Sequence, residues 1–135
     1  MIKVEKKIDS DGTIRWYKVG TNIFHREGGP AIEYANGTKY WYKEGKYHRD
    51  NGPAIEYNNG TKYWYRDGKR HREDGPAIAD ADGDKLWYQY GKLHREDGPA
   101  IEDANGDKHW YLKGTEIKCK SNEEFLRLLK MKAFW

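Results

Sequence analysis

The sequence contains a single cysteine in 135 residues and no long hydrophobic run. Cys119 has no partner for an internal disulfide, so we expect a chain suited to a reducing cytoplasm. The first residues, MIKVEKKIDSDG, lack the apolar segment that is typical of a secretory signal. No apolar run reaches the roughly 18 residues that a transmembrane helix needs, so we expect no membrane span.

The chain also lacks an excess of charge of either sign. Its 25 basic and 22 acidic residues give a net charge of +3. This balance does not fit an acidic mimic of DNA, and it falls short of the clustered Lys and Arg of a dedicated nucleic-acid-binding protein. Hydrophobic residues make up only 36%, but six Trp, eleven Tyr and three Phe are among them. Tyr and Trp cover large areas and keep a polar tip, which suits a thin protein of one layer.

One sequence motif, called the repeated phrase below, occurs four times at a constant spacing of 23 residues. The second copy reads HRDNGPAIEYNNGTKYWYRDGKR. A fixed period of this length predicts a stack of like units with an extended surface, and such surfaces are used for binding. The copies begin at His25, His48, His71 and His94.

Each unit is predicted to be a β-hairpin followed by a linking arm. In the second unit, residues 53–57 and 61–66 have strand composition, and the Asn-Asn-Gly turn between them accepts positive φ. A second turn follows at residues 67–68, and residues 69–71 form a brief third extended segment. The predicted fold class is all-β: an elongated single-layer antiparallel sheet of tandem 23-residue hairpins with a C-terminal capping α-helix.

The sequence predicts one repeat domain over residues 1–135, with different caps at its two ends. Residues 1–24 form an N-terminal cap and partial repeat, 25–116 the four repeats, and 117–135 a capping helix and tail. Ser121 and Glu124 form a capping box, which predicts a helix from about residue 122 to residue 132. The tail Ala133-Phe134-Trp135 either packs under that helix or anchors a partner or a second copy.

The unit resembles the MORN repeat, a β-hairpin module of the same length. The spacing of Tyr42, Gly45 and His48 matches the family's aromatic, glycine and histidine positions, although Trp here stands one residue before the aromatic position. The phrase W-Y-x-x-G-x-x-H-R-x-D-G-P-A is more similar still to tandem-repeat proteins of bacteriophages. That resemblance implies a small phage protein in a bacterial host cytoplasm, where such proteins bind and block host factors.

The repeated histidines do not have the pattern of a catalytic or metal site. An active site is normally unique, whereas His-Arg-Glu/Asp occurs in four equal copies, and ligands of one ion must lie within a few ångströms. We therefore expect no enzyme activity, no catalytic residue, no metal and no cofactor. Each histidine is predicted to be structural, with its ring against an aromatic side chain and one nitrogen bonded to a turn carbonyl.

The positions that vary between repeats favour protein binding. Three columns hold tyrosine or, at one position, arginine in the first two repeats and other residues, among them leucine and aspartate, in the last two. Tyr and Arg are favoured in binding hot spots. The predicted protein-binding residues are Tyr34, Tyr40, Tyr47, Tyr57, Tyr63 and Arg70. The predicted function is that of a non-catalytic phage-encoded protein that engages a host protein, such as an antiviral defence effector or nuclease, and inhibits or redirects it.

Two alternatives remain open from the sequence. A cationic row with aromatic platforms is typical of single-stranded nucleic-acid or nucleotide binding, although lysine stems that simply cover the rings would look the same. The other alternative is a structural or assembly module, including a homo-oligomer joined through the C-terminal helix and tail. The residues of the possible nucleic-acid-binding row are Lys39, Trp41, Lys62, Trp64, Lys85 and Trp87.

Overall fold

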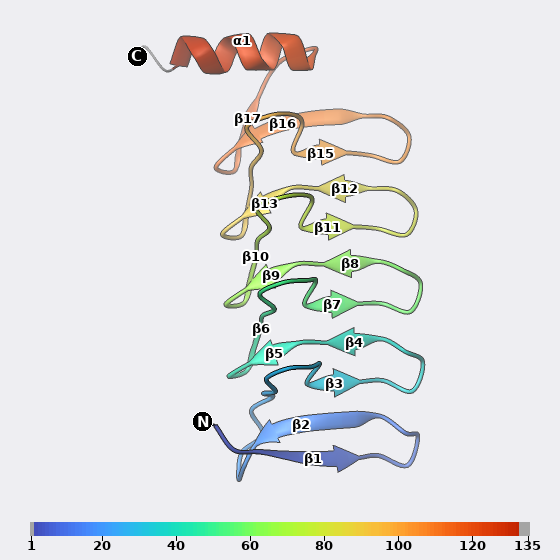
Figure 1. The fold of residues 1–135 in the computed structure, drawn as a ribbon. Helices are drawn as coiled ribbons and strands as arrows, with labels where there is room; N and C mark the ends of the chain where they lie inside the picture. The colour runs from blue at the N-terminus through green and yellow to red at the C-terminus, as the bar shows by residue number, and fades with distance from the viewer. Residues whose placement is uncertain (1, 133–135) are drawn as a thin grey trace.

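The computed structural model describes residues 2–132 and shows an elongated ladder of β-hairpins with a helix across its C-terminal end (Figure 1). An 11-stranded sheet runs the length of the ladder, and every pair of neighbouring strands in it is antiparallel. The strands follow in the order β1 (Val4–Ile8), β2 (Ile14–Lys18), β3 (Ile32–Glu33), β4 (Lys39–Tyr40), β7 (Ile55–Glu56), β8 (Lys62–Tyr63), β11 (Ile78–Ala79), β12 (Lys85–Leu86), β15 (Ile101–Glu102), β16 (Lys108–Leu112) and β17 (Thr115–Ile117).

Three small hairpins stand beside this main sheet, one for each of the first three repeats. The predicted second strand of the repeat is therefore split in two at its tryptophan. In the second repeat, Trp64 donates its N–H to the carbonyl of Ala77, just before β11 of the main sheet, while its own carbonyl accepts the N–H of His71 on the other side. The small hairpins are β5 (Tyr42–Lys43) with β6 (Lys46–Tyr47), β9 (Tyr65–Arg66) with β10 (Lys69–Arg70), and β13 (Tyr88–Gln89) with β14 (Lys92–Leu93).

The predicted all-β repeat fold with a capping helix is confirmed. Helix α1 (Asn122–Lys132) has the expected bounds, and Ser121 is its N-cap as predicted, while the Glu124 carboxylate bonds to the residue before the N-cap. The Ser121 hydroxyl accepts the N–H of Glu124 at 3.1 Å, and the Glu124 carboxylate accepts the N–H of Lys120 at 3.2 Å. The aromatic tail lies outside the described residues. Within residues 2–132, no helix is both long enough and apolar enough to cross a membrane.

The helix is fixed to the last rung by two aromatic side chains. Phe125 is fully buried and lies 6.4 Å from Trp110 between ring centroids. The indole N–H of Trp110 donates to the Asn122 side-chain oxygen at 3.1 Å. These contacts close the C-terminal end of the stack, where an open strand edge would otherwise face solvent.

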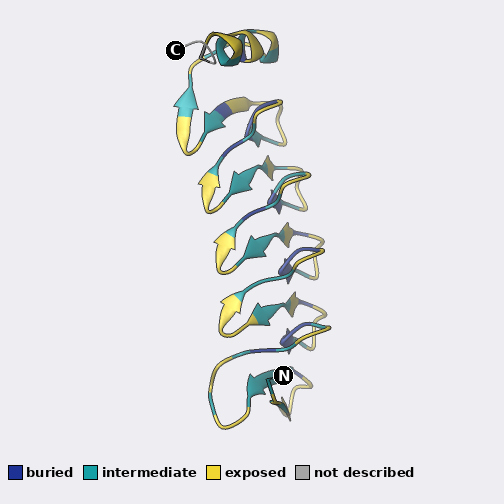
Figure 2. Cartoon of the chain, turned by 60° about the vertical axis from the view of Figure 1, so that its left-hand side comes forward, coloured by how far each residue is buried: buried dark blue, intermediate teal, exposed yellow. Residues whose placement is uncertain are grey.

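The core is thin and consists of small apolar residues in a central column. The buried residues are coloured dark blue in Figure 2, and they include the Ala-Ile pair of the first three repeats and Ala100 of the fourth. The strand register places isoleucines opposite residues such as Tyr40 and Tyr63 on one face. On the other face Glu33 and Glu56 lie opposite Lys39. One face of the sheet is therefore aromatic and the other is charged.

The small turn of each repeat needs two residues of positive φ. In the first repeat these are Glu44 at 48° and Gly45 at 80°, as in a type I′ turn. A non-glycine residue in this conformation is costly and persists where surrounding contacts hold it. Asp67, Tyr90 and Lys113 occupy the same position in the following repeats.

The repeated histidine supplies that contact by joining the end of one small hairpin to the turn of the next. Its Nδ1 atom accepts the backbone N–H of the residue 19 positions later, at 2.8 to 3.1 Å. The predicted bond to a turn carbonyl is therefore wrong, because the backbone group that faces the ring is an N–H donor. The four pairs are His25 with Glu44, His48 with Asp67, His71 with Tyr90, and His94 with Lys113.

A second side-chain link joins the wide turns at the opposite edge of the ladder. The hydroxyl of buried Thr61 accepts the N–H of Ala81, which lies 20 positions later, at 3.0 Å. In the third repeat a carboxylate takes the same place, and Asp84 accepts the N–H of Ala104 at 2.7 Å. The rungs are thus tied by side chains at both edges, in addition to the backbone ladder.

The arginine after each histidine lies between an indole ring and a glycine. The guanidinium carbon of Arg72 lies 3.9 Å from the centroid of the Trp64 ring, and its Nη1 donates to the Pro76 carbonyl at 3.1 Å. A Cβ atom at Gly75 would lie 2.8 Å from that carbon. A side chain at this glycine would have to push the guanidinium away from its place on the ring, so glycine preserves the stacked arrangement.

The histidine link predicts a large difference between two histidine substitutions. We expect His71→Ala to lower the free energy of unfolding by about 1–3 kcal/mol, because the N–H of Tyr90 loses its acceptor. His109→Ala is the matched control, since His109 is exposed and stands at a position of the fourth repeat that varies between repeats, and we expect a change within about 0.5 kcal/mol. Chemical denaturation followed by circular dichroism measures both, and equal losses would contradict the structural role of the link.

Candidate functional site

The aromatic face of the sheet carries a connected cluster of rings over the first two repeats. Tyr40 lies at its centre, with ring centroids 5.2 Å from Tyr34, 5.8 Å from Tyr47 and 6.2 Å from Tyr57. Tyr57 continues the cluster to Tyr63 at 5.7 Å. We call this surface the tyrosine face and define it by Phe24, Tyr34, Tyr40, Tyr42, Tyr47, Tyr57, Tyr63 and Tyr65.

All six residues predicted for protein binding come together on or beside this face. Arg70 is the sixth, and its guanidinium carbon lies 6.0 Å from the Tyr63 ring centroid and 5.4 Å from that of Tyr88. The prediction missed Tyr42 and Tyr65, whose ring centroids lie 4.5 and 5.0 Å from that of Tyr47. Both occupy positions that do not vary between repeats, so a search restricted to variable columns passes over them. Side chains two residues apart on a strand lie on the same face, so Tyr40 and Tyr63 indicate that Tyr42 and Tyr65 belong to this surface.

The rings support one another but remain partly open to solvent, since every tyrosine of the face is half-buried. Burial, followed by neighbouring tyrosines, raises the pKa of Tyr40 and of Tyr47 well above the usual range. Burial also raises the pKa of Tyr42 and of Tyr63. The face therefore presents neutral hydroxyls on a packed aromatic base, which can make both apolar contacts and hydrogen bonds with a partner.

Beyond the second repeat the same face becomes acidic. The column that holds Tyr34 and Tyr57 continues as Asp80 and then Asp103. Asp80 lies close enough to Tyr63 for its charge to raise the pKa of that hydroxyl, after the larger effect of burial. The surface thus changes from aromatic to acidic along the ladder.

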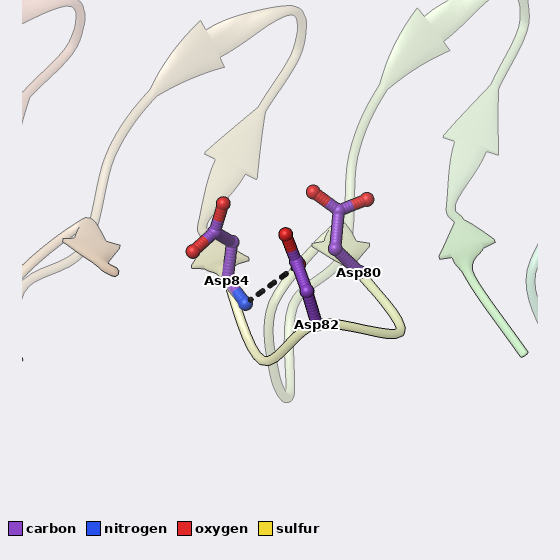
Figure 3. A group of neighbouring side chains, drawn as sticks. All are labelled: Asp80, Asp82 and Asp84. Atoms are coloured by element: carbon purple, nitrogen blue, oxygen red, sulfur yellow. Dashed lines mark hydrogen bonds between the residues drawn. The ribbon is translucent and has the colours of Figure 1, made fainter. Parts of the chain in front are cut away.

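Three carboxylates gather in the wide turn at this boundary (Figure 3). One oxygen from each of Asp80, Asp82 and Asp84 lies within 4.8 Å of the other two. Burial, and then the charges of Asp82 and Asp84, raise the pKa of Asp80. Three carboxylates could hold part of the oxygen shell of a hard cation such as Ca²⁺, which takes six to eight ligands. Asp84 also has a structural partner in the Ala104 N–H.

The opposite face carries the residues considered for nucleic-acid binding. Strand alternation predicts that these lysines and tryptophans share a face. Lys39, Lys62 and Lys85 are exposed on it, and Trp41, Trp64 and Trp87 are half-buried. The cation that lies over each of these rings is an arginine of the repeated phrase, with its guanidinium carbon 3.9 Å from the ring centroid. A base could stack on that side of a ring only after displacing the guanidinium.

Acidic residues lie within the lysine row itself. The strand register sets Lys39 between Glu33 and Glu56, and Lys62 is also opposite Glu56. Lys85 lies opposite Glu102. Alternating charges of this kind stabilise the sheet through cross-strand pairs, but they weaken attraction for a phosphate backbone.

No protein-family model matches the chain, and no curated protein matches it either. The resemblance to MORN repeats and to phage repeat proteins therefore stays a prediction from the residues. The candidate site is defined by its own geometry.

The tyrosine face predicts a loss of stability in alkali. Because the folded pKa values of Tyr40 and Tyr47 lie above those of the unfolded chain, their contribution is complete below about pH 10 and is lost as the pH rises further. Absorbance at 295 nm should show part of the tyrosine ionising only as the protein unfolds. Tyr40→Phe should reduce the loss, and a native titration identical to that of the denatured chain would contradict the packing.

Proposed function

We propose that this protein is a non-catalytic binding protein that engages another protein through the tyrosine face. The observation that carries the proposal is the half-buried cluster of packed tyrosines over the first two repeats, with Arg70 at its border. Tyrosine and arginine are enriched among the residues that supply most of the energy of protein interfaces. Rings already held by their neighbours lose little conformational entropy on binding.

The acidic continuation of the face favours a partner with a basic surface next to an apolar one. Asp80, Asp82 and Asp103 would lie opposite cationic groups of such a partner, and complementary charge speeds association and fixes its orientation. Proteins that bind nucleic acids carry basic surfaces of this kind. A nuclease or another nucleic-acid-binding defence protein therefore fits the chemistry.

The resemblance of the repeated phrase to phage proteins supports a target in the bacterial host. The proposed action is steric: the flat sheet covers the target's working surface without changing it chemically. Binding through the lysine row receives less support, because arginines cover the tryptophans and glutamates lie beside the lysines. The proposed location is accordingly the host cytoplasm.

The repeat itself provides substitutions that test the face without disturbing the fold. Residue 57 is equivalent to Asp80, and residue 63 is equivalent to Leu86. We expect Tyr57→Asp combined with Tyr63→Leu to lower affinity for the partner at least tenfold while the melting temperature changes little, since the third repeat already uses both residues. Lys62→Ala is the matched control on the opposite face, with an expected change of less than about twofold.

Crosslinking identifies the partner and the face together. A photoreactive phenylalanine at position 40 or 63 should capture the partner in host cells, whereas the same group at position 39 or 62, on the opposite face, should not. Mass spectrometry identifies the captured protein, and purified components then give the affinities. Capture only from positions 39 and 62, or binding abolished by nuclease treatment, would contradict the proposal and favour nucleic acid.

A further inference from the structure

The two ends of the ladder are closed differently. Helix α1 covers the C-terminal end, whereas β1 is the edge strand at the N-terminal end, and no other segment of residues 2–132 pairs with its outer side (Figure 1). Strand β1 has five residues, VEKKI, without proline or glycine. An edge strand of this length is a template for pairing with another strand.

The backbone bonds to β2 show which residues of β1 face outward. Lys3 accepts the N–H of Val19, and Asp9 donates its N–H to Thr13. Hydrogen-bonding groups alternate in direction along a strand, so the odd-numbered residues face β2. Val4, Lys6 and Ile8 therefore have backbone groups that point away from the sheet.

The side chains of β1 are divided between the two faces of the sheet. Lys7 extends over the Tyr17 ring, with its Nζ 4.9 Å from the ring centroid, and Glu5 is the strand partner of Tyr17. Glu5 and Lys7 therefore share the aromatic side of the sheet. Lys6 extends over the Trp16 ring on the other side, at 5.7 Å.

In one antiparallel register, Glu5 and Lys7 of this strand are complementary to the same residues of a second copy. A two-fold axis through Lys6 sets Glu5 opposite the Lys7 of a second copy, and it sets Val4 opposite Ile8. The two Glu5–Lys7 pairs fall at positions without mutual backbone bonds, where side chains approach most closely. Shifting the register by two residues sets Glu5 opposite itself in one direction and Lys7 opposite itself in the other.

We propose that the protein forms a symmetric dimer in which the β1 strands of two copies pair in this register. The partner is a second copy of this chain, and the two main sheets become one continuous antiparallel sheet. Lys6 meets its own copy at the axis, and each Lys6 extends over the Trp16 ring of its own chain. Both capping helices lie at the outer ends of the dimer.

The dimer would bring the two tyrosine faces together at its centre. A two-fold axis perpendicular to a sheet keeps equivalent faces on the same side. Tyr17 and the tyrosines of the first two repeats then form one surface twice as long, with the acidic ends outward. This consequence for binding rests on the proposed function, whereas the dimer itself does not.

Charge exchange at two positions tests the dimer directly. We expect sedimentation equilibrium and light scattering to show a dimer for the natural sequence at micromolar to submillimolar concentration. Glu5→Lys and Lys7→Glu each create two like-charge pairs, and each should raise the dimer dissociation constant at least tenfold. An equimolar mixture of the two variants should restore a 1:1 heterodimer, because every pair is again opposite in charge.

Two further variants separate this interface from other contacts. Lys6→Pro removes one outward N–H without removing a bond to β2, and it should also yield monomers. Leu126→Glu, on the exposed side of α1, should leave the dimer intact. Circular dichroism checks that each variant is folded. A monomeric natural protein at submillimolar concentration, or a dimer that survives both charge changes and is lost with Leu126→Glu, would overturn the proposal.

Discussion

The fold depends on the hydrogen bond that each repeated histidine accepts from the next small turn. The bond requires an imidazole with a free lone pair on Nδ1, so it fixes the tautomer, with the proton on Nε2. It also holds a non-glycine residue in a conformation of positive φ and sets the distance between successive hairpins. Because the ladder has only a thin core of alanine and isoleucine, these repeated polar links carry much of its specificity.

Once these links fix the backbone, the remaining positions are free to vary in character. The tyrosine face, its acidic continuation and the outer edge of β1 all lie at positions that make none of the repeated links. The same ladder can therefore carry aromatic residues in two repeats and carboxylates in the next without a change of architecture. In stacked repeats, one set of residues stabilises the fold and another set is left for recognition, so we look for the function in the residues of the surface.

Local signals allowed the sequence to predict the hairpins, the helix N-cap and helix 122–132, and the grouping of the tyrosine columns. Contacts between segments were harder to predict. The arginine over Trp64 comes from a residue eight positions later, and nothing in strand alternation indicates it. The break of the strand at Trp64 depends on bonds to two different neighbours, Ala77 and His71. The histidine was correctly placed in a structural role but with the wrong backbone partner.

The most direct test of this account is a nuclear magnetic resonance measurement on the histidine link. In protein labelled with ¹⁵N, the account predicts a coupling across the hydrogen bond between the His71 Nδ1 and the amide nitrogen of Tyr90. Equivalent couplings should appear for His25, His48 and His94, each with its ring proton on Nε2. Rings protonated on Nδ1, with no coupling to these amides, would contradict the account.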